Sequence, residues 1–135
     1  MNNEVTNKLA KFLIGQVESN RGIALASLAR TATNSTSDFT NVGHQSLIVV
    51  FDVTAVSTSD VKLKIEGKDP ASGKYYTILE SASVTTISIN VYRVSPHLTA
   101  AANTIAKDIM PTTFRFTMTH ANANSTTYSV GYMLV

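Results

Sequence analysis

The chain has 135 residues, no cysteine and a formal net charge of +2 at pH 7. This length suits one domain that buries a core without disulfides, and the missing cysteines exclude thiolate metal sites and a thiol nucleophile. The nearly balanced charge, without a cluster of lysine and arginine, argues against nucleic acid and anionic membranes as partners. No apolar run reaches the ~20 residues that span a bilayer, and we expect no secretory signal.

Residues 1–22 are predicted to form a helical arm. Between residues 3 and 19, apolar residues recur at helical spacing, and they are Val5, Leu9, Phe12, Leu13 and Val17. Asn3 suits the N-cap of this helix, and Gly22 suits its end. The apolar stripe of an amphipathic helix has to cover a surface, which here is either its own domain or a neighbouring subunit in an assembly. These five apolar residues are therefore the candidate partner-docking residues.

Residues 23–135 are predicted to form the second unit, an all-β domain. The strands expected in chain order are 23–33, 47–56, 61–66, 75–79, 84–95, 114–119 and 128–134. Strand 47–56 is apolar at nearly every position, which predicts a central strand covered on both sides. Residues 34–43 are expected to be a polar loop. Residues 97–108 are expected to be a long crossover between two sheets, with room for one helical turn.

The hairpin over residues 61–79 is the clearest element of this domain. Its first strand alternates apolar residues with charged ones, so that one face is apolar and the other charged. Asp69-Pro70 and Ser72-Gly73 then reverse the chain. Together with the other strands, and without helices between them, this predicts an antiparallel β-sandwich of jelly-roll or immunoglobulin-like topology. The sequence does not choose between these two topologies.

The three histidines, His44, His97 and His120, lie in separate segments and lack the spacing of metal ligands. We therefore expect them to be solvent or turn residues, and we expect no metal and no cofactor. The chain also lacks the nucleophile elbow of serine hydrolases and the glycine-rich loop that binds phosphates. These observations favour a protein that is not an enzyme.

Asp52 is the acidic residue with the greatest potential for an unusual environment, because it lies within the most hydrophobic strand. A functional interpretation would make it a general base whose pKa is raised by burial. No second carboxylate or histidine stands at a spacing that would complete a catalytic pair. We therefore favour a structural carboxylate, either facing an edge or paired with Arg93 or Arg115.

An aromatic platform for sugar is a further hypothesis. It would use the Asn-rich turn 122–124 and the five tyrosines, Tyr75, Tyr76, Tyr92, Tyr128 and Tyr132. The favoured alternative is that these rings cover the core while their hydroxyls reach water. A glycan is therefore an alternative partner that no motif supports.

Four stretches of the chain resemble a small virion-protein family of tailed bacteriophages: 28–33, 66–79, 91–103 and 128–131. These stretches are turns and strand pieces, and the resemblance spans residues 23–135, whereas residues 1–22 are an addition to the pattern. The resemblance implies a capsid decoration or cement protein on the capsid surface of the virion, which binds the major capsid protein as a homo-oligomer. The alternatives are a tail, neck or fibre-attachment component, and a carbohydrate-binding module at the virion surface.

Overall fold

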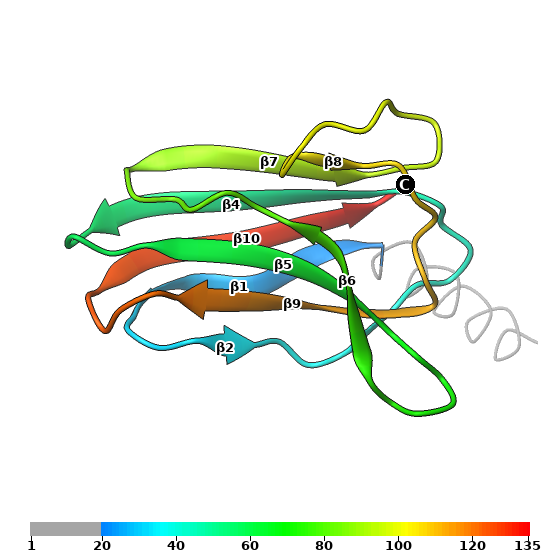
Figure 1. Cartoon of the computed structure of the whole chain (residues 1–135), viewed down its shortest axis with the longest axis horizontal. Coiled ribbons are helices and arrows are strands. Elements are labelled where there is room, and N and C mark those ends of the chain that lie inside the picture. Colours follow the sequence, from blue (N-terminus) through cyan, green and yellow to red (C-terminus); the bar gives the residue numbers. More distant parts are fainter. Residues whose placement is uncertain (1–19) are drawn as a thin grey trace, which may run out of the picture.

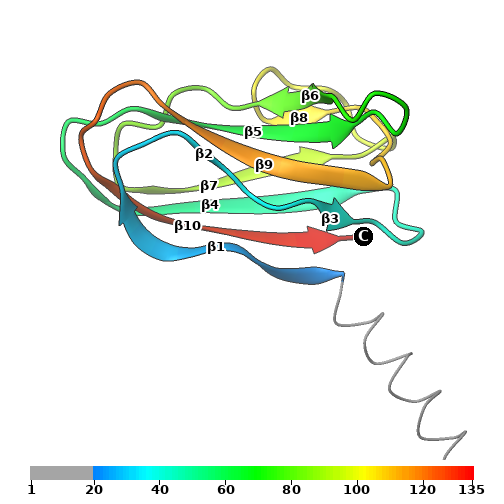
Figure 2. The same ribbon diagram turned by 90° about the horizontal axis from the view of Figure 1, so that it is seen from below.

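The computed structural model describes residues 20–135, which form two β-sheets packed face to face (Figures 1 and 2). Sheet A has the strand order β1 (Arg21–Arg30), β10 (Thr126–Leu134), β4 (Leu47–Val56), β7 (Ser88–Val94) and β8 (Ile105–Ala106). Sheet B has the order β2 (Asn34–Ser35), β9 (Thr113–His120), β5 (Val61–Lys68) and β6 (Tyr75–Glu80), and β3 (Phe39–Thr40) also pairs with β9.

The predicted all-β sandwich is confirmed for this part of the chain, and residues 20–135 contain no helix. The crossover between β7 in sheet A and β9 in sheet B connects the two sheets as expected. It holds no helical turn but the short strand β8, which pairs in parallel with β7. The predicted arm, with its candidate docking residues Val5, Leu9, Phe12, Leu13 and Val17, lies outside the described residues.

The hairpin β5–β6 has the predicted form. Val61, Leu63 and Ile65 point into the core and are fully buried. Asp69 orders the turn, because its carboxylate accepts hydrogen bonds from the backbone N–H of Ala71 at 3.0 Å and of Ser72 at 3.3 Å, as well as from the Ser72 hydroxyl at 2.6 Å. Gly73 closes the turn with a φ of 72°, a conformation that costs glycine little.

Three details of the strand predictions are wrong. The segment 34–43 is not only a loop, because β2 and β3 pair with β9 within it. Strand β4 is covered on one side only: alternate residues from Leu47 to Val53 are buried, while Ile48, Val50 and Asp52 on the other side are half-buried. Strand β1 ends at Arg30, three residues before the end of the predicted strand 23–33, and its register with β10 shifts twice.

The core lies between the two sheets and is made of alternate residues from β4, β5, β9 and β10. Near β3, the core contains a cluster of four aromatic rings with centroids 4.9–6.3 Å apart. We call this cluster the aromatic centre, and its members are Phe39, Phe114, Phe116 and Tyr132. Phe114 and Phe116 are fully buried and come from the same strand, two residues apart, so they point to the same side of sheet B.

Candidate interaction surface

The outer face of sheet A, turned away from sheet B, carries aliphatic side chains that lie in register across its strands. Ile23 of β1 is opposite Gly131 of β10, which is opposite Val50 of β4, which is opposite Val91 of β7. The neighbouring rows place Met133 beside Ile48, and Ile89 beside Asp52. We call the following residues the apolar face: Ile23, Ile48, Val50, Ile89, Val91 and Met133.

The apolar face includes Ile89 and Val91 because the alternate residues of β7 point into the core. Tyr92 and Val94 point inward and are 4% and 0% exposed, and Asn90 lies on the same inner side. The intervening Ile89 therefore points to solvent and is 71% exposed. Ile23 at the other end of the face is 75% exposed. Three aliphatic side chains of this face, Ile23, Ile89 and Met133, are exposed, and Ile48, Val50 and Val91 between them are half-buried. A contiguous apolar patch of this kind suits a surface that contacts another molecule.

The centre of the apolar face is hollowed, because Gly131 has no side chain between Ile23 and Val50. A Cβ atom built at Gly131 would meet only the Gly22 carbonyl oxygen, at 3.8 Å. The resulting groove is lined by Arg21 and Gly22 of β1, Gly131, Tyr132 and Met133 of β10, and Val50 of β4. A protruding side chain of a partner would fit this groove.

Charged side chains stand at the margins of the apolar face. Arg21 and Arg93 lie at the two ends of one outer row, with Met133 and Ile48 between them, and Asp52 is opposite Ser129 and Ile89 two rows away. Within residues 20–135 Asp52 forms no ion pair, so the predicted pairing with Arg93 or Arg115 is not found there. Arg115 lies on the other sheet.

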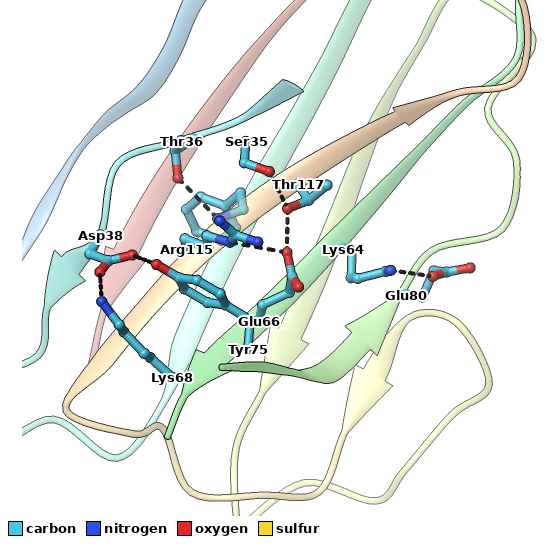
Figure 3. Close-up of polar contacts among 11 residues, drawn as sticks. Ser35, Thr36, Asp38, Lys64, Glu66, Lys68, Tyr75, Glu80, Arg115 and Thr117 are labelled. Atoms are coloured by element: carbon cyan, nitrogen blue, oxygen red, sulfur yellow. Dashed lines mark hydrogen bonds and ion pairs between the residues drawn. The ribbon is translucent and has the colours of Figure 1, made fainter. Parts of the chain in front are cut away.

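The outer face of sheet B has the opposite character, since its charges are paired with each other (Figure 3). Glu66 is only 8% exposed, and its Oε1 lies 3.3 Å from Nε of Arg115 on the neighbouring strand β9. The Thr117 hydroxyl donates a hydrogen bond to the same oxygen, and Ser35 bonds to Thr117 at 2.8 Å. This network joins β2, β9 and β5.

The network continues through Tyr75 of β6. The Arg115 guanidinium lies 3.4 Å from the centroid of the Tyr75 ring, and the Tyr75 hydroxyl donates to Oδ1 of Asp38 at 2.6 Å. Lys68 binds the other carboxylate oxygen of Asp38 at 2.9 Å. The hydrogen bonds from Lys68 and then from Tyr75 lower the pKa of Asp38, and the bond to Asp38 raises the pKa of Lys68. The polar groups of this face thus satisfy each other, which suits a structural role.

The sequence could indicate that Glu66 and Arg115 point to solvent, because both alternate with buried residues. It could not pair them, because the pairing depends on the register of β5 and β9, which places Glu66 opposite Arg115. Asp38 comes from the segment between β2 and β3, for which we expected only a loop.

His120 is not the solvent or turn residue that the sequence suggested. Its Nε2 lies 2.9 Å from the Tyr128 hydroxyl, to which Asn34 Nδ2 donates at 3.2 Å. Its Nδ1 is buried without a partner among the described residues. The Arg30 guanidinium lies 4.7 Å from the centroid of the Tyr128 ring. Burial, and then the charge of Arg30, lower the pKa of His120 below its usual value of 6.5, so the folded protein favours the neutral imidazole.

Stability should therefore decrease as the pH falls through the ordinary histidine range. His120 takes up a proton more readily in the unfolded chain, so its contribution is complete above about pH 7.5 and is lost as the pH falls through 6.5 toward its lower folded pKa. Thermal unfolding between pH 8 and pH 5 measures this effect. His120→Gln should flatten the profile, whereas His97→Gln should keep it, because His97 is exposed and its Nε2 bonds only to Gln45 at 3.1 Å.

The residues of the sugar hypothesis do not come together. Tyr92 and Tyr128 are 4% and 0% exposed, and Tyr75 is engaged with Arg115 and Asp38. In the Asn-rich turn, Asn122 and Asn124 donate their side-chain amides to the Thr58 carbonyl, at 3.3 and 2.9 Å. These amides hold two neighbouring turns together.

Among residues 20–135, no group of three histidine or acidic side chains could hold a metal ion, and no helix could cross a membrane. No protein-family model matches the chain, and no curated protein matches it.

Proposed function

We propose that the protein is a structural component of a bacteriophage virion, namely a capsid decoration or cement protein that binds and stabilises the lattice of the major capsid protein. The apolar face of sheet A carries this proposal. Ile23 and Ile89 leave most of their surface in water in the described chain, so covering them with another surface would be favourable. A protein that works inside an assembly meets such a surface, and the resemblance of residues 23–135 to phage virion proteins supports a virion as that assembly.

The strand order supports a jelly roll as the topology of the proposed shell protein. Apart from the hairpin β5–β6 and the short strands β3 and β8, the chain changes sheet at each successive strand. An immunoglobulin-like sandwich instead ends with two neighbouring strands of one sheet. Here the last two strands, β9 and β10, lie in different sheets. Jelly rolls are common in viral shells, a likeness of fold that supports the proposal without establishing it.

The mechanism proposed is mechanical. A sandwich with a packed aromatic centre and a cross-strand network on sheet B is stiff, so it can bridge neighbouring capsid subunits without deforming. Each contact can be small, because many copies arranged by capsid symmetry add up to a large total stabilisation. No cofactor is needed for this function.

A binding experiment tests the proposal directly. Purified protein is mixed with expanded capsids that lack it, and bound protein is measured after sedimentation. Cryo-electron microscopy of the decorated particles then locates the protein. We expect saturable binding and regularly spaced density over the capsid lattice. An absence of binding contradicts the cement function, and density confined to one vertex or to the tail would reassign the protein to the neck or tail.

A further inference from the structure

We infer that the apolar face of sheet A is covered by the same face of a second copy of this chain, in a two-fold symmetric dimer. The inference rests on the proposed assembly role of the protein. It assigns this face to the contact between copies, so that the contact with the capsid uses other surfaces of the dimer. Two sheets that pack face to face with their strands roughly aligned are a common arrangement in proteins. In a dimer of this kind the same residues meet from both sides.

Two of the charges at the margins of the face, Arg93 and Asp52, are complementary in a symmetric dimer, and Arg21 lies apart from them at the β1 margin. Arg93 and Asp52 lie on adjacent strands, two rows apart, with Val50 and Val91 between them. A two-fold axis that lies in the plane of the interface and passes between Val50 and Val91 therefore brings each Arg93 toward the partner copy's Asp52. The dimer then has two reciprocal ion pairs. Within residues 20–135 neither side chain has an ion pair of its own.

The aliphatic residues form the centre of the same interface. Val50 lies close to the proposed axis, so that it approaches Val50 of the other copy. Ile23 and Ile89 lie toward opposite margins of the face. From the spacing of strands and residues, the backbone beneath the face spans about 14 Å in each direction, or about 20 Å with the side chains included. This is at the small end of specific interfaces, so we expect dissociation in the micromolar range.

Charge reversal is the decisive test, because it can be compensated. The full chain and its variants are measured by analytical ultracentrifugation over a wide range of concentrations. Asp52→Arg and Arg93→Asp should each raise the dimer Kd at least ~10-fold, because each places like charges opposite one another. The double variant should restore the Kd to within about 3-fold of the original. Val50→Asp should abolish the dimer, and Lys74→Asp in the distant β5–β6 turn should leave it unchanged.

Proximity across the axis can be measured separately. The chain has no cysteine, so a Val50→Cys variant provides a unique thiol. A bismaleimide that spans about 10 Å, the usual distance between stacked sheets, should link two copies of this variant. The same reagent should not link copies of a Lys74→Cys variant.

Several outcomes would overturn the inference. They are a wild-type chain that stays monomeric at all concentrations, single charge reversals without effect, and a double variant that is not rescued. If Leu9→Asp breaks a dimer that the variants of the apolar face leave intact, residues 1–19 make the contact instead. Circular dichroism and melting temperature show whether each variant is folded. Capsid binding is measured independently, so decorated capsids without a solution dimer would refute the inference and leave the proposed function standing.

Discussion

Replacing Phe116 with alanine should lower the free energy of unfolding by about 3–5 kcal/mol. Phe116 is fully buried, and its ring packs against Phe39, Phe114 and Tyr132 at centroid distances of 5.7, 5.8 and 6.2 Å. The substitution removes a buried ring and leaves a cavity between two sheets that cannot close on it. Urea denaturation followed by circular dichroism measures the loss.

Ile89→Ala is the matched control for this prediction. Ile89 also lies on a strand and also loses several carbon atoms in the substitution, but it is 71% exposed. Its loss should cost less than about 0.5 kcal/mol in the monomer, because an exposed side chain contributes little burial. Comparable losses for both variants would show that Phe116 does not belong to a tightly packed core.

Replacing Arg115 with alanine should lower the free energy of unfolding by about 2–3 kcal/mol. Breaking a buried ion pair costs more than this, but the Arg115 and Glu66 side chains are 25% and 11% exposed, and solvent screens part of the effect. The variant leaves the Glu66 carboxylate without its cation and also removes the guanidinium that lies over the Tyr75 ring. Chemical denaturation at pH 7 gives the value.

A double substitution identifies the cause of this loss. In Glu66→Leu/Arg115→Leu no carboxylate is left unpaired, so stability should return to within about 1 kcal/mol of the wild type. The ion pair of Lys64 with Glu80, 3.6 Å apart on the same face, is the comparison, because its partners are 28% and 42% exposed. Lys64→Ala should cost less than about 0.5 kcal/mol. A double variant as unstable as Arg115→Ala would show that packing, and not the unpaired charge, explains the loss.

Patterns within a single strand predicted much of the fold. Alternation in residues 61–66 identified the buried side of β5, and the residues of the following turn identified the hairpin. Both depend only on local geometry, because a strand turns its side chains to alternate sides and a turn selects residues that tolerate its backbone. The short strands β2 and β3 were missed, because two-residue strands have no alternation and form only where β9 offers a free edge.

Features that join distant strands could not be read from the chain in this way. The aliphatic residues of β4 indicated that protein packs on both sides of this strand. The amino-acid types of Ile48 and Val50 do not show whether their side packs on the same chain or on another molecule. In β7 the choice of side is set by Tyr92 and Val94, which fill the core, and Ile89 has to take the other side. The apolar face appears only once the register of β1, β10, β4 and β7 is known.

The irregular edge strand β1 limits how copies of this protein can join. Its register with β10 shifts between Ile23 and Leu25 and again between Leu25 and Leu28. A regular edge strand of this length would accept the edge of another molecule and allow unlimited growth into fibres. The shifts bend the backbone away from the straight ladder that such growth requires. At high local concentration, copies of this chain should therefore not add to one another edge to edge through β1.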